Sequence, residues 1–228
     1  MKKGWANWFL TIFLCALLIP CCSLTAQTDL SEGWEVEATK RQPPDKVMAA
    51  IGVKRGMVIG EIGAGRGRYT VYLAREVGTE GKIFANDINK DALAYLDSRC
   101  KREGFNNIQI IIGKEEDPLF KPNSLDMAIM VWVYHMIEEP DNLLKNLIPA
   151  LKPGAKLVIL DPVDSEIDEE FNIDRSEPGV TIPTIKERIE KSARESGYEL
   201  VEVKTFLEMD YIFILQPKDK GSVASDHK

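Results

Sequence analysis

Apolar and amphipathic segments alternate along most of this chain. Five apolar segments have the length and the flanking turn residues of buried strands: residues 56–63, 82–88, 108–113, 125–133 and 156–162. Five other segments space their apolar residues as one face of a helix does: residues 43–53, 68–78, 90–104, 140–154 and 184–197. Strands that alternate with helices predict a parallel sheet with helices on both faces.

The last part of the pattern differs from the rest. Two strand-like segments, Leu200–Phe206 and Tyr211–Gln216, are separated by only four residues. A crossover between parallel strands needs a dozen or more residues, so the last strand must run antiparallel to its neighbour. The whole pattern predicts an α/β fold, with a Rossmann-like, seven-stranded, mostly parallel sheet, helices on both faces and a C-terminal antiparallel hairpin strand.

The N-terminus has a different composition. Lys2 and Lys3 precede an apolar segment at residues 5–20, and Cys21 and Cys22 follow it. This order is typical of a cleaved or lipidated export signal, while an uncleaved membrane anchor and a buried helix are the other interpretations. We therefore expect four parts along the chain: a signal peptide or anchor at residues 1–22, a linker at 23–42, the folded domain at 43–217 and a disordered tail at 218–228.

Composition limits the classes of function. The chain has 228 residues, 44% of them hydrophobic, and a net charge of -7. An acidic chain without clustered basic residues argues against nucleic-acid binding. Cys100 is the only cysteine outside the first 22 residues and the only histidines are His135 and His227, so neither an internal disulfide nor a metal site is expected.

Three glycines, Gly63, Gly65 and Gly67, follow the first predicted strand. Glycines in such a turn let the backbone lie against a ligand, although nucleotide sites and purely structural turns use the same pattern. Asp87, at the end of the second predicted strand, suits hydrogen bonds to two ribose hydroxyls. Glu61 would repel a pyrophosphate and favour a ligand with an ammonium and a sulfonium group, which points to S-adenosylmethionine rather than to a dinucleotide.

The segments EIGAGRGRYTVYLA and ANDIN, and the stretch from residue 125 to residue 162, resemble the motifs of class I S-adenosylmethionine-dependent methyltransferases. The resemblance extends to a group of small, often exported bacterial methyltransferase-domain proteins and covers roughly residues 43–217. It implies that S-adenosylmethionine is the cofactor.

The same resemblance implies roles for individual residues. Gly63, Ala64 and Gly65 would contact the methionyl part of the cofactor, and Asp87 would hold the ribose. Ile88 would lie against the adenine, unless it only packs at the end of the sheet. The family often has Asp where this chain has Lys114, so either Glu115 or backbone groups would face the adenine amino group, unless this turn is merely solvated.

Candidate catalytic residues follow the fourth predicted strand, where ligands bind in open α/β sheets. Methyl transfer is an in-line displacement on an activated cofactor, so a base is needed only for an acceptor that carries a proton. His135 suits that role and Tyr134 is a second candidate, although both also suit a packing role.

Trp132 would wall the methionyl pocket or belong to the core. The acidic connection Asp161–Pro183 is either a lid that favours a cationic or polar substrate or a solvated loop.

These features predict an S-adenosylmethionine-dependent methyltransferase with a small-molecule or lipid-like acceptor. The alternative is a catalytically silent S-adenosylmethionine-binding protein of the same fold, and a third hypothesis is an NAD-dependent oxidoreductase. The protein would be exported (periplasmic, secreted or a lipoprotein) or associated with the membrane through its N-terminal anchor. Charges around the apolar segment favour a domain outside the cytoplasm, whereas the cofactor is made inside cells, so both localisations stay open.

Overall fold

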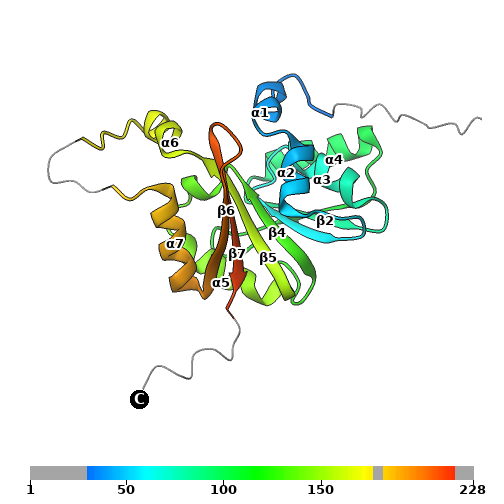
Figure 1. The fold of residues 1–228 in the computed structure, drawn as a ribbon. Helices are drawn as coiled ribbons and strands as arrows, with labels where there is room; N and C mark the ends of the chain where they lie inside the picture. Colours follow the sequence, from blue (N-terminus) through cyan, green and yellow to red (C-terminus); the bar gives the residue numbers. More distant parts are fainter. Residues whose placement is uncertain (1–29, 177–181, 219–228) are drawn as a thin grey trace, which may run out of the picture.

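The computed structural model describes residues 30–176 and 182–218 (Figure 1). Helices and strands follow in this order: α1 (Val36–Arg41), α2 (Pro44–Ile51), β1 (Val58–Ile62), α3 (Thr70–Val77), β2 (Lys82–Asp87), α4 (Lys90–Glu103), β3 (Ile108–Ile112), β4 (Leu125–Val131), α5 (Pro140–Leu147), β5 (Leu151–Pro162), α6 (Asp164–Phe171), α7 (Ile185–Ser196), β6 (Tyr198–Lys204) and β7 (Asp210–Pro217). Short 3₁₀ helices cover Tyr134–Met136 and Ile148–Ala150.

The seven strands form one sheet in the order β3-β2-β1-β4-β5-β7-β6. The pairs among β1 to β5 are parallel, and β7 runs antiparallel to both β5 and β6. The sheet and its antiparallel hairpin strand, as predicted from the sequence, are thereby confirmed.

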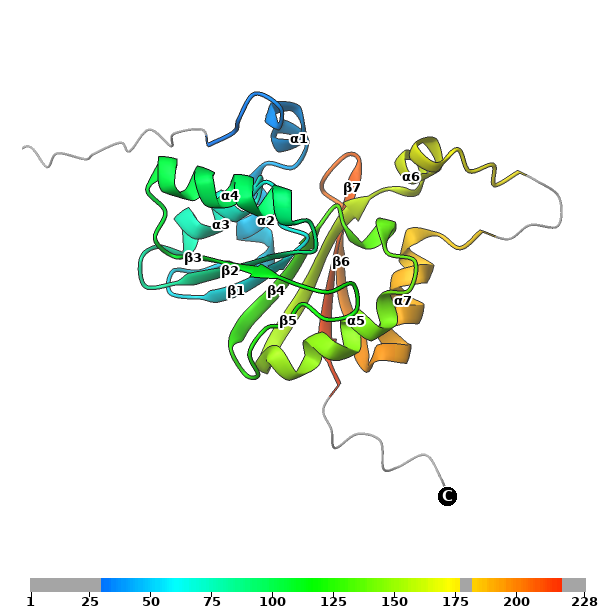
Figure 2. The ribbon, with the colours of Figure 1, turned by 180° about the vertical axis from the view of Figure 1, so that it is seen from behind.

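Helices cover both faces of the sheet (Figures 1 and 2). Helices α2, α3 and α4 lie on one face, and α5 and α7 on the other. Side chains alternate along β4, so that Met127 and Ile129 join the first core, whereas Ala128 and Met130 join the second. Because both faces of the central strands β1 and β4 are buried, these strands are apolar almost throughout, which made them visible in the sequence.

Residues 30–42 differ from the expected linker. They include α1 and pack on the domain, with the side chains of Glu35 and Gln42 fully buried. Glu35 Oε1 accepts a hydrogen bond of 2.8 Å from Nη2 of Arg99 in α4, and both side chains are inaccessible to solvent. This buried ion pair makes the polar segment part of the folded domain. Its partner lies in another helix, so no local sequence pattern reveals it.

Two further boundaries differ from expectation. The helix expected at residues 140–154 is shorter, because α5 ends at Leu147 and β5 already begins at Leu151, which pairs with Leu125 of β4. The acidic connection expected to be a loop contains α6, whose Ile167 is buried in the second core. Ile167 thus anchors this acidic helix to the second core.

The leader expected at residues 1–22 and the tail after Lys218 lie outside the described residues. Within residues 30–176 and 182–218, no helix combines the length and the apolar character that a membrane crossing requires.

Candidate active site

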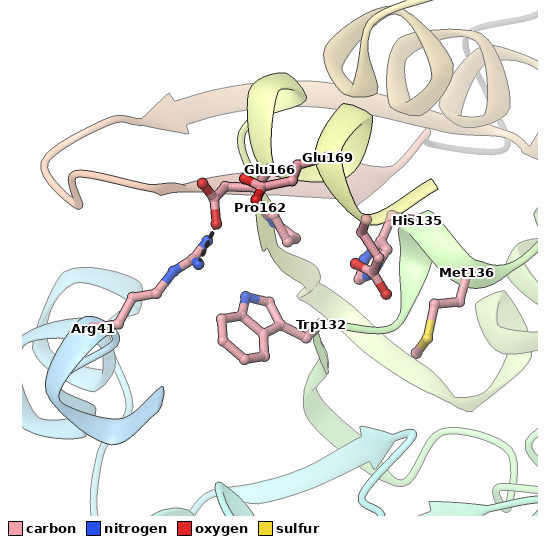
Figure 3. Close-up of a pocket in the computed structure, with 8 residues that line it drawn as sticks. Arg41, Trp132, His135, Met136, Pro162, Glu166 and Glu169 are labelled. Atoms are coloured by element: carbon pink, nitrogen blue, oxygen red, sulfur yellow. Dashed lines mark hydrogen bonds and ion pairs between the residues drawn. The ribbon is translucent and has the colours of Figure 1, made fainter. Parts of the chain in front are cut away.

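Two cavities open at the carboxyl ends of the parallel strands, where strand order reverses between β1 and β4. The first, here called the loop cavity, has a volume of about 730 Å³ and is lined by the glycine turn after β1 and by the end of β2. The second, here called the histidine cavity, has a volume of about 590 Å³ and is lined by His135 and by α6 (Figure 3). Trp132 and Met136 line both cavities, which are therefore neighbours.

The glycine turn needs its glycines for two different reasons. Gly63 has a φ of 74°, and a Cβ atom there would lie 2.2 Å from Cγ2 of Val133. Gly65 has a φ of 53°, but a Cβ there would meet nothing within 4 Å, because this residue faces the loop cavity. The turn thus presents bare backbone to the cavity, which suits close contact with a ligand.

Asp87 ties the glycine turn to the end of β2. Its Oδ2 accepts a hydrogen bond of 2.8 Å from the backbone N–H of Gly65, and its Oδ1 accepts one of 2.8 Å from that of Asn89. Asp87 also lines the loop cavity. Each carboxylate oxygen has a further lone pair, so the group can accept hydrogen bonds from a sugar without giving up the turn.

Glu61 lies beneath the turn and does not line either cavity. Its side chain is buried, and its Oε2 accepts a hydrogen bond of 2.6 Å from the Thr70 hydroxyl at the start of α3. Burial raises the pKa of the Glu61 carboxyl to about 7, although the hydrogen bond from Thr70 and the nearby positive charge of Arg68 oppose this shift. Any role toward a cationic ligand would therefore be exerted through its charge rather than by contact.

The other residues predicted to bind the cofactor divide into two groups. Ile88, Glu115 and Trp132 line the loop cavity. Ala64 and Gly67 do not line it, since both are buried in the turn, where the Ala64 N–H donates to the Asn86 carbonyl and the Gly67 N–H donates to that of Ala64. They shape the turn instead.

His135 is held by a buried carboxylate that sequence analysis did not single out. Asp161, fully buried at the end of β5, accepts a hydrogen bond of 2.8 Å from the backbone N–H of His135, and its Oδ1 lies 3.1 Å from His135 Nδ1. The other ring nitrogen, Nε2, lies 3.5 Å from Oε2 of Glu170. Burial alone would lower the pKa of His135, but the hydrogen bond with Asp161 and the charges of Asp161 and Glu170 outweigh it and raise this pKa.

Tyr134 does not join this pair. Its side chain is fully buried in the second core, and its hydroxyl donates a hydrogen bond of 3.2 Å to the carbonyl of Arg188 in α7. The ring lines neither cavity. Of the two catalytic candidates, only His135 lies at a cavity.

Helix α6 sorts its carboxylates between two faces. Asp164 and Asp168, one turn apart, bind Arg175. Three other carboxylates of α6 line the histidine cavity: Glu166, Glu169 and Glu170. Their spacing of i, i+3 and i+4 places them together on the other face of the helix. Arg41 reaches the same cavity from α1 and binds Glu166 at 2.9 Å (Figure 3). The helical spacing was readable in the sequence, but the partner in α1 was not.

The described parts of the chain contain no group of three or more His, Cys, Asp or Glu residues arranged to hold a metal ion. The loop cavity instead combines bare backbone, a carboxylate at the end of β2 and an exposed apolar side chain, Ile88. These are groups that can hold the amino-acid part, the ribose and the base of a nucleoside cofactor, so the residues present fit S-adenosylmethionine.

Comparison with known proteins agrees with this geometry. A family model described as a methyltransferase domain matches residues 53–205. The chain is 27% identical over 125 residues to a ubiquinone/menaquinone biosynthesis C-methyltransferase of Idiomarina loihiensis (53% of this chain, 50% of that protein). It is 25% identical over 123 residues to a demethylmenaquinone methyltransferase of Bacillus pumilus (54% and 53%). The chain thus spans about half the length of these curated relatives.

Solved structures share the fold. A methyltransferase of Aquifex aeolicus, described as dependent on S-adenosylmethionine, has a TM-score of 0.63 and 24% identity, and the likeness covers 75% of this chain and 88% of that one. A phosphoethanolamine N-methyltransferase of Haemonchus contortus, in complex with S-adenosylhomocysteine, has a TM-score of 0.61 and 18% identity over 78% of this chain and 53% of that one. The family model covers strands β1 to β6 and all residues that line the two cavities except Arg41, and the chain therefore belongs to the methyltransferase-domain family of class I S-adenosylmethionine-dependent methyltransferases.

Proposed function

We propose that this protein transfers a methyl group from S-adenosylmethionine in the loop cavity to a small-molecule or lipid-like acceptor in the histidine cavity. The observation that carries the proposal is the shared wall: Trp132 and Met136 line both cavities. A donor and an acceptor on the two sides of one wall can meet at its edge, and holding them there is the main contribution that methyl transfer needs from a protein.

S-adenosylmethionine supplies a methyl group already activated on a positively charged sulfur. Around it, the backbone of Gly63 and Gly65 would hold the methionyl part, Asp87 the ribose hydroxyls, and Ile88 the adenine. Glu115 lines the same cavity and would face the adenine amino group. The ionised Glu61 carboxylate beneath the turn would favour the net positive charge of the cofactor.

His135 would act as the general base. Asp161 holds the Nδ1 atom of His135 by a hydrogen bond. The neutral imidazole would therefore take a proton from the methyl acceptor at its other nitrogen, Nε2. A proton accepted there is stabilised by Asp161 and Glu170, whose charges raise the pKa of His135. Such a base is required only if the acceptor carries a weakly acidic proton, as a hydroxylated aromatic ring or a protonated amine does.

The names of the curated relatives suggest the first acceptors to test, because one is named for ubiquinone and menaquinone biosynthesis and the other for the methylation of demethylmenaquinone. The experiment measures S-adenosylhomocysteine formation by the full chain with demethylated quinols, phenols, amines and phospholipid vesicles. We expect one class to be methylated and His135→Gln to lower that rate by about 100-fold or more while binding of S-adenosylmethionine is kept. Tight cofactor binding without turnover on any class would instead favour the silent binding protein.

We also propose that residues 1–22 export the protein or anchor it to a membrane. The support is the order of basic, apolar and small residues in that segment. Mass spectrometry of the mature N-terminus tests this directly. An unprocessed chain in the cytosolic fraction would contradict it.

A further inference from the structure

The wall between the two cavities has an unusual backbone. Trp132 follows β4 directly and has a φ of 57°, a left-handed conformation that bulky residues rarely adopt. Its backbone N–H donates a hydrogen bond of 2.8 Å to the carbonyl of Leu160 in β5. A bulky residue stays in this conformation only where the surrounding structure holds it there. The Trp132 side chain therefore needs a partner that fixes the position of its indole ring.

Asp210, the first residue of β7, does so. Its carboxylate is fully buried, and Oδ1 accepts a hydrogen bond of 2.6 Å from the indole Nε1 of Trp132. Asp210 pairs with Pro162 in the antiparallel register of β7 with β5, so its own position is set by the sheet. Trp132 is thus held to the sheet by two hydrogen bonds, one from its backbone N–H and one from its ring nitrogen.

The Asp210 carboxylate also accepts hydrogen bonds from the two residues at the end of the segment before α2, Arg41 and Gln42. Its Oδ2 accepts a hydrogen bond of 2.7 Å from Arg41 Nε, and its Oδ1 also accepts one of 2.8 Å from Gln42 Nε2. The guanidinium of Arg41 lies 4.8 Å from the centre of the Trp132 ring, and that of Arg68 lies 4.9 Å from it. The buried carboxylate is therefore neutralised by a cation that also packs on the wall.

We propose that Asp210 is a positioning residue for methyl transfer: it holds the Trp132 indole as a fixed wall at whose edge donor and acceptor meet, and Arg41 and Gln42 complete that support from the N-terminal side. The inference rests on the proposed function, since the two cavities matter only if they hold two reactants. It gives the hairpin strand and residues 41–42 a part in the reaction although, of these residues, only Arg41 lines a cavity.

The test compares Asp210→Ala, Asp210→Asn and Trp132→Phe in the full chain, with Glu208→Gln, an exposed change in the same hairpin, as the control. We expect Asp210→Ala to lower kcat by about 100-fold and the KM for S-adenosylmethionine to change by less than about threefold, because misplacement of a reactant affects the reaction rather than binding. Asp210→Asn should recover part of kcat, since the amide oxygen can still accept from the indole.

Two further readouts separate positioning from mere stability. In a protein labelled with 5-fluorotryptophan, the fluorine signal that Trp132→Phe removes should shift and broaden in Asp210→Ala. Adding Asp210→Ala to Trp132→Phe should lower kcat by much less than it does alone, because the two residues act as a unit. An unshifted signal, or effects of the two changes that multiply, would overturn the inference.

The fluorine measurement needs no turnover and decides the indole contact even if no acceptor is found. A wild-type protein that binds S-adenosylmethionine but methylates nothing contradicts the proposed function, and with it the catalytic part of this inference. A wild-type protein that is active, with Asp210→Ala equally active but less stable, contradicts the inference alone.

Discussion

His135 Nδ1 and Asp161 Oδ1 lie 3.1 Å apart in a pair whose side chains are almost inaccessible to solvent. The same carboxylate also accepts a hydrogen bond from the backbone N–H of His135, so the ring has one orientation. That orientation leaves Nε2 at the histidine cavity, next to Glu170. The pair therefore has the geometry of an oriented base, and its ionisation should be visible in the pH dependence of the reaction.

We expect activity to rise with pH as His135 loses its proton, with a midpoint above the ordinary histidine pKa, because the pKa of His135 is raised. Glu170→Gln removes one of the charges that raise it and should move the midpoint to lower pH. The neighbouring change Glu169→Gln is the matched control and should shift it less. The measurement is kcat/KM against pH, and a midpoint unaffected by Glu170→Gln would contradict the assignment.

Asp87→Ala should weaken the binding of S-adenosylmethionine by about 1.5–3 kcal/mol, because a charged acceptor for the ribose hydroxyls is lost. Calorimetry gives this value directly. Because Asp87 also accepts from Gly65, the melting temperature must be compared as well. Asp91→Ala, an exposed carboxylate in the first turn of α4, is the control and should leave affinity unchanged. If Asp87→Ala binds S-adenosylmethionine as tightly as the control Asp91→Ala does, the ribose is held elsewhere.

Cofactor binding should release a proton from Glu61. The raised pKa of about 7 leaves this carboxyl partly protonated near neutral pH, and a cationic ligand above it favours the ionised form. Affinity should therefore increase as pH rises through about 7 in wild type and depend less on pH in Glu61→Gln. Calorimetry in two buffers of different ionisation enthalpy detects the proton. Identical apparent enthalpies in the two buffers would rule the coupling out.

Gly63→Ala should destabilise the fold by about 2–4 kcal/mol, the sum of a left-handed backbone and a clash with a stiff, branched side chain. The added Cβ would lie 2.2 Å from Cγ2 of Val133, which has little freedom to move. Gly104→Ala is the matched control, since its φ is also positive (77°) but a Cβ there would meet nothing within 4 Å. Denaturant unfolding should show a clearly smaller loss for the control, and equal losses would exclude the clash.

Glu35→Gln should cost about 3 kcal/mol of unfolding free energy, because it leaves the buried Arg99 without its fully buried counter-charge. Glu37→Gln, in the neighbouring α1, removes an ion pair whose carboxylate is 86% exposed and should cost less than about 1 kcal/mol. Thermal unfolding of both variants checks this. Equal, small effects would contradict a stabilising role for the buried Glu35–Arg99 ion pair.

The order of residues along the chain was enough to predict the sheet, the glycine turn and the approximate place of Asp87 and His135. All of these depend on local information: the period of apolar residues, the positions of glycines, and the residue that ends each strand. Parallel strands bring their carboxyl ends to one edge, so residues in four separate motifs could be assigned to one site without coordinates.

Which of those residues face a cavity, and which groups support them, depends on how the chain packs in three dimensions. Tyr134 and His135 are adjacent in the sequence, yet one packs in the core and the other meets Asp161. Arg41 and Asp210 are 169 positions apart, and their contact depends on how the hairpin and α1 pack at the same edge (Figure 1). Burial decides whether a polar residue is a surface group or a support, and burial is a property of the packed chain rather than of any local pattern.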